Sequence, residues 1–383
     1  MKNAALIAHI RQLCSLGLGG RAIMPALLRA VRDLVPAEWA EFFWVDGDGE
    51  MSNHYAEQTL PADALQFYFR RASVGGEHPL FAAFRTRSVQ EDPVTTLTVT
   101  ESFRRTELYR SVMQHLGAEH ALYCVIRERG RSLGQLSLYR SRDHPPFTNS
   151  ERTAIAGIAG YIARGLDETF GSGRSGGTDL GWQDTEHQAM LTLDRAGTIR
   201  HCSGAARRLL LYATLDSVNY ATLGLQEGAI CDVMRGLADQ VVTMRCREDS
   251  VMSQPTATIT NRWGRFVLRA YWLTDETGQP DALIGVQIRR QETTVLRLSQ
   301  AMHGLALSPQ QKEVGLLLAQ GKSNPEIAGA LGVSLNTANY HVKQLFSKLN
   351  AHERNEVTPK LLSMGHAARN PDAAQPGAQP GAR

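Results

Sequence analysis

The C-terminal part of the chain carries the clearest periodic pattern of apolar and polar positions. Between residues 308 and 349, apolar side chains recur three or four positions apart in three short segments: Val314, Leu317 and Leu318; Ile327, Ala328 and Leu331; Ala338, Val342, Leu345 and Leu349. Residues at this spacing share one face of an α-helix. The pattern therefore predicts three amphipathic helices that pack against one another.

Local start and stop signals separate these helices. A serine N-cap precedes each of them: Ser308, Ser323 and Ser334. Gln311 and Glu326 stand three residues after the first two serines, where their side chains complete capping boxes. Gly321 and Gly332 follow the first two helices and suit the left-handed turn at a helix C-terminus. The short turn at 332–334 predicts the steep crossing angle of a helix-turn-helix.

The third helix also has a polar face that suits DNA: Asn336, Asn339, Tyr340, Lys343 and Ser347. An asparagine amide can form a bidentate pair with adenine, and a lysine can reach guanine or phosphate. Thr337 and the first N–H groups of this helix suit phosphate oxygens. Residues 305–363 hold six Lys or Arg and four Asp or Glu, a modest net charge of +2, so we expect specific binding to need a dimer. A plain helical subdomain is the less favoured alternative.

This stretch resembles the LuxR-type helix-turn-helix. The matching residues are Leu307–Pro309, Glu313–Val314, Gly321–Asn324, Glu326–Ala328, Leu331–Ser334, Thr337, His341–Val342 and Lys348–Leu349. The resemblance implies that the residues at positions 339, 340 and 343 face the bases and that Thr337 contacts the DNA backbone. The predicted DNA-binding set is Ser334, Asn336, Thr337, Asn339, Tyr340, Lys343 and Lys348.

Two positions depart from the family pattern. The family usually has lysine where this chain has Asn339, so its base preference or affinity should differ. Pro359 interrupts the expected fourth helix, and proline is tolerated only in a first turn, so that helix must start late or be kinked. In the family this helix pairs two subunits, and the implied dimer contacts are Val357, Leu361 and Leu362.

Residues 1–170 have a mixed pattern of helices and strands. We expect helices at about 3–15 and 22–35, a strand at 39–45, a hairpin turn at 46–49, a mainly helical stretch at 60–116, strands at 120–127 and 132–140, and a helix to about 168 that opens with the capping box Thr148–Glu151. This order resembles a GAF-type sensor domain. The segments Gly134–Arg140 and Pro146–Glu151 carry most of that resemblance.

Residues 182–292 predict a second small domain. We expect strands at 188–193 and 198–202, a helix at 205–211, further helices to about 244, and strands at 256–261, 265–273 and 282–290. Phe266, Leu268, Ala270 and Trp272 alternate onto one face. The order resembles a PAS domain, and Leu193–Ile199 fits its opening.

The predicted fold class is therefore α/β multidomain, with two α+β sensor-like domains and a C-terminal all-α four-helix domain of LuxR type. The predicted parts are the GAF-like domain (1–170), a Gly/Ser-rich flexible linker (171–181), the PAS-like domain (182–292), a connecting helix (293–304), the helix-turn-helix domain (305–365) and a disordered tail (366–383). The connecting helix is equally consistent with a dimer contact, a signal path or a simple spacer.

Composition and motifs narrow the function. The chain has 383 residues and a net charge of +3, which indicates neither a membrane surface nor general nucleic-acid binding. Motifs such as GxSxG, HExxH, GxxxxGK[ST] and CxxC do not occur, so we expect no enzyme activity, no cofactor and no metal site. The five cysteines have no metal or redox spacing and are expected to be buried reduced thiols. The clustered aromatics, among them Phe42–Trp44, Tyr109 and Tyr123, are expected in the core more than around a ligand.

These observations favour a cytoplasmic one-component transcriptional regulator of the LuxR family, without a membrane span. The expected partners are double-stranded DNA, a second copy of the chain, and a small-molecule or protein signal. Two alternatives stay open. The sensor half could bind a protein partner in place of a small molecule, or the GAF-like half could be an enzyme with a DNA-binding tail.

Overall fold

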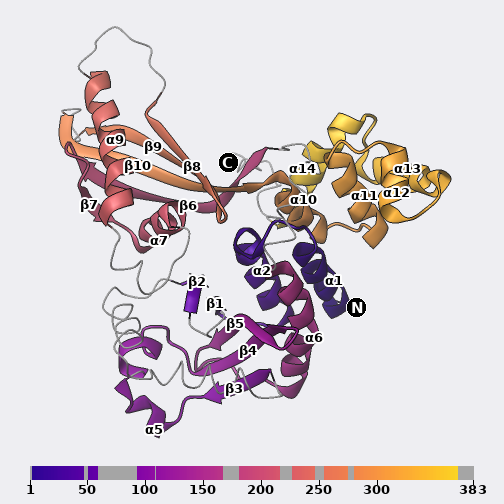
Figure 1. The fold of residues 1–383 in the computed structure, drawn as a ribbon, viewed down its shortest axis with the longest axis horizontal. Helices are drawn as coiled ribbons and strands as arrows, with labels where there is room; N and C mark the ends of the chain where they lie inside the picture. Colours follow the sequence, from indigo (N-terminus) through magenta and orange to yellow (C-terminus); the bar gives the residue numbers. More distant parts are fainter. Residues whose placement is uncertain are drawn as a thin grey trace, which may run out of the picture. The chain divides into compact units, whose positions relative to one another are not determined.

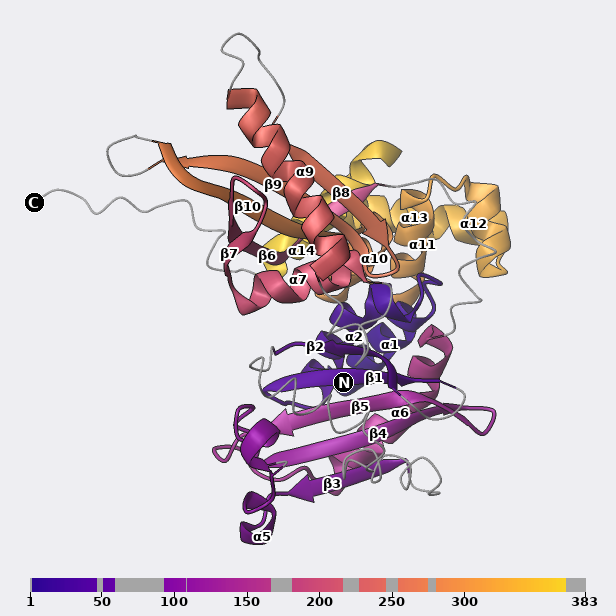
Figure 2. The same ribbon diagram turned by 60° about the vertical axis from the view of Figure 1, so that its left-hand side comes forward.

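The computed structural model describes residues 2–46, 51–58, 93–107, 109–166, 181–215, 227–245, 254–274 and 280–369. The chain divides into two compact units, one of Met1–Glu168 with Asp184–Gln291 and one of Thr169–Gln183 with Glu292–Arg383. The first unit carries two five-stranded sheets and the second is mainly helical (Figures 1 and 2). The predicted class, α+β domains followed by an all-α domain, is confirmed.

The first sheet has the strand order β2 (Met51–Ala56), β1 (Trp39–Val45), β5 (Arg131–Arg140), β4 (His120–Glu128) and β3 (Val94–Thr98). All neighbouring strands in it are antiparallel. Helices α1 (Lys2–Cys14), α2 (Gly20–Leu34) and α6 (Asn149–Leu166) pack together and against the sheet (Figure 1). A short helix, α5 (Glu101–Arg104), and a π-helical turn at Tyr109–Met113 precede β4.

Most of the predicted elements of this region are confirmed. The strand at 39–45 has the predicted bounds, and the predicted Thr148–Glu151 capping box forms, with Thr148 N donating to Glu151 Oε2 at 2.8 Å. The strand β3 was not predicted, because its threonine-rich sequence lies in a stretch expected to be helical. Residues 60–92 of that stretch, and residues 47–49 of the predicted hairpin turn, lie outside the described residues.

The strand register divides the first sheet into two unlike faces. On one face Ala40 lies opposite Leu138 and Phe42 opposite Leu136, so this face is apolar. On the other face, which we call the aromatic–polar face, the facing pairs are Trp39 with Tyr139, Glu41 with Ser137 and Phe43 with Gln135. Alternate residues of a strand point to opposite sides, so the two sets do not mix. All six of the latter residues are buried.

The second sheet repeats the strand order of the first. Its strands are β7 (Ile199–Cys202), β6 (Trp182–Asp194), β10 (Pro280–Thr293), β9 (Gly264–Thr274) and β8 (Thr256–Asn261). Helices α7 (Gly204–Thr214) and α9 (Glu227–Arg245) pack on β8 and β9. The predicted alternation along β9 is confirmed for Phe266, Leu268 and Ala270, which are all buried, while Trp272 is half-buried. The strand β6 begins six residues before the predicted start. Its first half was not predicted because it is polar.

Aromatic rings connect the two sheets within the first unit. Tyr55 of β2 stacks on Tyr212 of α7 with ring centroids 5.4 Å apart, and on Trp263 at 5.9 Å. Trp263 lies in the turn between β8 and β9 and is 1% exposed. The regions predicted as separate GAF-like and PAS-like domains therefore belong to one compact unit. The predicted linker lies mostly outside the described residues, which resume at Gly181.

The second unit is a helical domain. It contains α10 (Thr294–His303), α11 (Pro309–Ala319), α12 (Asn324–Leu331), α13 (Leu335–Leu349) and α14 (Val357–Arg369). A 3₁₀ turn at Arg354–Glu356 precedes α14, so Pro359 falls in the first turn of the helix, and the predicted late start is confirmed. Helix α14 continues to Arg369, beyond the expected start of the tail, and residues 370–383 lie outside the described residues.

Candidate nucleic-acid interface

The three predicted N-caps build the helices of this domain. Gln311 N donates to Ser308 Oγ at 3.2 Å and Ser308 N to Gln311 Oε1 at 2.9 Å, which closes the first capping box. Ser323 N donates to Glu326 Oε2 at 2.8 Å in the second box. At the third helix, Thr337 N donates to Ser334 Oγ at 3.2 Å. Each bond satisfies an N–H group that has no partner inside its helix.

The turn between α12 and α13 sets the direction of α13. Gly332 caps α12 in the left-handed region, with φ of 64° and ψ of 34°. Ser334 starts the next helix two residues later. Helix α13 packs against both α11 and α12, and its Ala338 and Leu345 are fully buried. The predicted helix-turn-helix is therefore confirmed, with the buried stripe of α13 facing inward.

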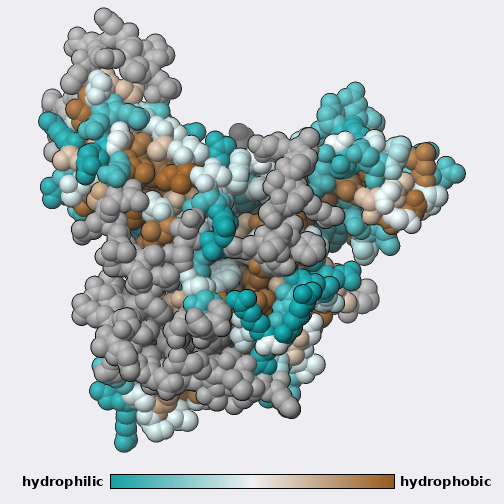
Figure 3. All heavy atoms as spheres, in the orientation of Figure 1, coloured by the Kyte–Doolittle hydropathy of each residue, from teal (hydrophilic) through white to brown (hydrophobic). Residues whose placement is uncertain are grey.

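The opposite side of α13 is an exposed polar stripe. At about 100° per residue, positions 336, 339, 340, 343 and 347 fall on one side of the helix. All five are exposed, and the Tyr340 side chain is 60% exposed. Val333 and Leu335 are exposed beside the start of this stripe, and Figure 3 shows apolar surface over α12 and α13. Exposed apolar side chains next to hydrogen-bonding groups are a typical feature of an interaction surface.

Ser334 and Thr337 lie at the N-terminal end of α13, beside the stripe. Their hydroxyl oxygens are 2.8 Å apart, so one donates to the other. The N–H groups at this end carry the positive end of the helix dipole and suit an anion such as phosphate. The predicted base-facing and phosphate-facing residues are therefore brought to one surface, with the exception of Lys348.

Lys348 does not lie with the other predicted DNA contacts. Its Nζ donates to Ala306 O at 2.8 Å and to Gln311 Oε1 at 3.0 Å. Lys348 is nine residues from Asn339, which places the two on opposite sides of the helix. Lys348 is exposed and joins α13 to the start of α11. Its contact with DNA stays a prediction.

Two of the three predicted dimer contacts are buried within the single chain. Val357 and Leu361 are 0% exposed within the single chain, where α14 packs against α10, α11 and α13. Leu362 is half-buried and Met364 is 38% exposed, so these two are the accessible large apolar side chains among residues 357–365 of α14. The sequence pattern of α14 could not distinguish these cases, because the same apolar stripe would suit packing within the chain or contact with a second subunit.

Sequence reasoning missed the partners of Asn339. Asn324 Nδ2 donates to Asn339 Oδ1 at 2.7 Å, and Arg354 donates to Asn324 Oδ1 at 2.5 Å. Arg354 also donates to the backbone oxygen of Lys322. The contact spans three separate elements, and no local pattern in the sequence predicts it.

The second capping box carries a perturbed carboxylate. Hydrogen bonds from Ser323 N, the Ser323 hydroxyl and Lys322 lower the pKa of Glu326 to about 2. Glu326 thus stays charged at the start of α12, where the helix dipole favours a negative group. It adds a fixed negative charge close to the Asn324 contact.

Comparison with known proteins assigns this domain. The family model for bacterial regulatory proteins of the luxR family matches residues 305–360. The C-terminal domain belongs to the luxR family. The match covers α11 to α13 and the first residues of α14, which are the elements that build the exposed stripe.

One relative and two solved structures illustrate the extent of the likeness. A Sinorhizobium fredii protein described as the HTH-type transcriptional regulator y4qH is 38% identical over 60 residues, which is 16% of this chain and 18% of that protein. A GAF domain/HD domain protein of Geobacter sulfurreducens covers 39% of this chain and 94% of its own at 21% identity and a TM-score of 0.28. The Vibrio cholerae LuxR-type receptor VqmA covers 47% and 83% at 16% identity and a TM-score of 0.17.

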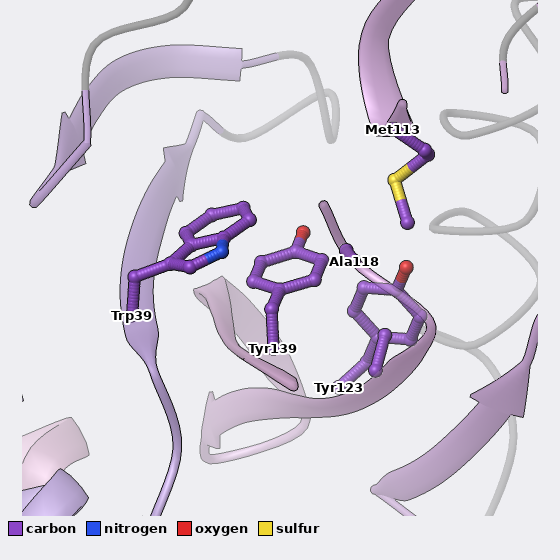
Figure 4. Close-up of a cluster of buried hydrophobic side chains, with 6 residues drawn as sticks. Trp39, Met113, Ala118, Tyr123 and Tyr139 are labelled. Carbon is purple, nitrogen blue, oxygen red and sulfur yellow. The ribbon is translucent and has the colours of Figure 1, made fainter. Parts of the chain in front are cut away.

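The first sheet holds a second group of candidate residues outside the luxR-family domain. On the aromatic–polar face, the rings of Trp39 and Tyr139 stack at 3.8 Å beside Tyr123 and Met113 (Figure 4). Glu41 is 7% exposed; its carboxylate accepts a hydrogen bond from the Tyr139 hydroxyl and lies 3.3 Å from His54 Nε2. Buried polar groups are costly unless they are paired, so this network marks the face as unlike an ordinary core.

The remaining expectations concern metals, membranes and thiols. Among the described residues, no group of three or more His, Cys, Asp or Glu side chains is arranged to hold a metal ion. No helix in the described ranges has the length and apolar character needed to span a bilayer. Cys14 and Cys124 are buried as expected, but Cys202 and Cys231 are exposed, which corrects the prediction for these two.

Proposed function

We propose that the protein is a sequence-specific, DNA-binding transcriptional regulator whose N-terminal two-sheet unit receives a signal. In this proposal α13 enters the major groove as the recognition helix. The observation that carries it is the exposed stripe Asn336, Asn339, Tyr340 and Lys343 on a capped helix of a luxR-family domain. Asparagine and lysine supply the hydrogen-bonding groups that read base edges, and Ser334 and Thr337 lie where backbone phosphates would bind.

The proposed active form is a homodimer in the cytoplasm. The net charge of +2 over 305–363 gives one domain little electrostatic affinity, and two domains reading half-sites about one helical turn apart overcome this limit. We propose Leu362, with the neighbouring Met364, as the apolar contact between α14 helices, because these side chains are accessible and Val357 and Leu361 are not.

For the signal, we propose the aromatic–polar face of the first sheet. Stacked aromatic rings and a buried carboxylate suit a small ligand with an apolar ring and a hydrogen-bonding group. Trp39 Nε1 is a buried donor without a hydrogen-bond partner among the described residues. A protein partner on the N-terminal unit is the alternative signal. We propose no catalytic role for this unit.

Binding of the purified chain to a genomic DNA fragment library at two salt concentrations tests the function. We expect protected sites with inverted half-sites that persist at the higher salt concentration. Asn339→Ala and Lys343→Ala should weaken these sites, while Gln310→Ala, at an exposed position of α11, should leave them unchanged. Binding that is non-specific and disappears as salt rises would contradict the proposal.

A further inference from the structure

Three side chains form a directed hydrogen-bond relay that ends on the recognition helix. The relay consists of Arg354 before α14, Asn324 at the start of α12 and Asn339 on α13. The Arg354 guanidinium donates to Asn324 Oδ1 at 2.5 Å, and Asn324 Nδ2 donates to Asn339 Oδ1 at 2.7 Å. Arg354 is itself held by its bond to the Lys322 carbonyl.

The chemistry of arginine fixes the direction of this relay. A guanidinium group has donors only, so the group that Asn324 turns toward Arg354 must be its carbonyl oxygen. The Asn324 amide nitrogen is then left to face Asn339, and a nitrogen donor requires an oxygen acceptor. The Asn339 side chain therefore turns its oxygen toward α12, which leaves its NH₂ group for the exposed side of α13.

We propose that Asn339 reads guanine through its NH₂ group, and that Asn324 and Arg354 are positioning residues that set this preference. The inference rests on the proposed DNA-binding function and names the base that one of its residues selects. Guanine presents two adjacent acceptors, N7 and O6, in the major groove. The bidentate pairing with adenine requires both the oxygen and the nitrogen of the amide to face the base, and the relay keeps the oxygen engaged.

The relay also gives Asn339 the donor character of a lysine side chain. A lysine at position 339 would present donors only. The bond from Asn324 makes Asn339 a donor group as well, without the positive charge. A neutral donor contributes little to counterion release, so the base preference at this position should persist as salt rises while the total affinity falls.

Selection of random duplexes by the full-length chain tests the proposal, and Asn339→Ala identifies the base pair that this residue reads. We expect G·C at that pair, and replacing it by A·T should lower affinity at least about fivefold. With the unaltered protein, 7-deazaguanine at the same position should also weaken binding, because it lacks the N7 acceptor. Selection of adenine by the wild-type chain would overturn the proposal.

The variant Asn324→Asp tests directly whether Asn324 orients the Asn339 side chain. Aspartate still accepts from Arg354 but cannot donate, so Asn339 must turn its NH₂ toward position 324 and present its oxygen to the base. The preference should then change from guanine to a base with a donor, adenine or cytosine. Asn355→Asp, an exposed neighbour of Arg354, adds the same charge outside the relay and should keep guanine.

Two further outcomes are informative. If Asn324→Asp keeps the preference for guanine, the relay does not orient Asn339 and the proposal is wrong. If the wild-type chain selects no sequence at any position, the proposed DNA-reading function fails, and the base assignment fails with it. The two failures are distinguishable, since the first leaves a selected motif and the second leaves none.

Discussion

The contact between α10 and α14 depends on a single glycine. A Cβ atom built on Gly365 of α14 would lie 2.4 Å from Ala301 Cβ and 2.6 Å from Ala301 Cα of α10. Distances this short are far inside van der Waals contact, and the second atom belongs to the backbone, so a side-chain rotation cannot relieve them. Gly365→Ala therefore forces the two helices apart.

The expected cost follows from two opposing effects. Overpacking of a tight contact costs about 1–3 kcal/mol, toward the upper end where backbone must move. Replacing glycine by alanine inside a helix stabilises the helix by about 1 kcal/mol, which offsets part of this cost. The net loss should thus be about 1–2 kcal/mol. Gly329→Ala in α12 is the matched control, because a Cβ there meets no atom within 4 Å. It should stabilise its helix by about 0.5–1 kcal/mol.

Hydrogen exchange of the full-length chain measures this effect locally, without assuming two-state unfolding. In Gly365→Ala the amides of α10, residues 294–303, should exchange roughly tenfold faster, since 1.4 kcal/mol corresponds to a factor of ten. Gly329→Ala should leave α10 unchanged and slow exchange in α12. Equal protection of α10 in the wild type and in Gly365→Ala would refute the reasoning.

Three further predictions concern the C-terminal domain. Because the pKa of Glu326 is lowered to about 2, its charge stabilises α12 at pH values above about 4.5, and this stabilisation is lost as the pH falls from about 4.5 toward 2. Glu326→Gln should remove this pH dependence from the hydrogen exchange of α12. An unchanged pH profile in the variant would contradict the stabilising role of the Glu326 capping box. Lys343→Ala should reduce the slope of log affinity against log salt by about one, as expected for one lost phosphate or base contact, and an unchanged slope would exclude a direct ionic contact. Lys348→Ala should leave that slope unaltered but destabilise the α11–α13 contact by about 0.5–1.5 kcal/mol in exchange measurements; a smaller slope would support the predicted DNA contact of Lys348.

The features that sequence predicted well are those encoded within a few residues. Ser308 with Gln311 and Ser323 with Glu326 are capping boxes whose partners are three positions apart, and both form. Gly332 adopts the left-handed conformation that its position after a helix indicates. Such local signals specified the helix-turn-helix before any tertiary contact was known, because the bonds that start and end a helix are made by neighbours in the sequence.

The features that sequence could not predict depend on partners far along the chain. Val94–Thr98 forms an edge strand through pairing with β4, although it stands in a stretch that looked helical. Lys348 sits among family residues and was assigned to DNA, yet its partner Ala306 lies 42 residues earlier. The buried hydrogen-bond network of Glu41 could not be predicted, because it depends on the strand register that places Glu41 near Tyr139 and His54. Long-range pairing decides such cases, and it leaves little trace in local periodicity.

The connecting helix α10 packs closely within the helical unit. From sequence, α10 was equally consistent with a spacer, a dimer contact or a signal path. A spacer would be solvated, but seven of the ten residues of α10 are buried. Because Gly365 of α14 has no side chain, α10 can also pack closely against α14. Its buried residue Gln300 donates to both carboxylate oxygens of Glu292, each at 3.0 Å, at the end of β10. The hydrogen bonds to Glu292 and the close approach at Gly365 therefore join α10 to the last residues of β10 and to α14, which a solvated spacer would not do.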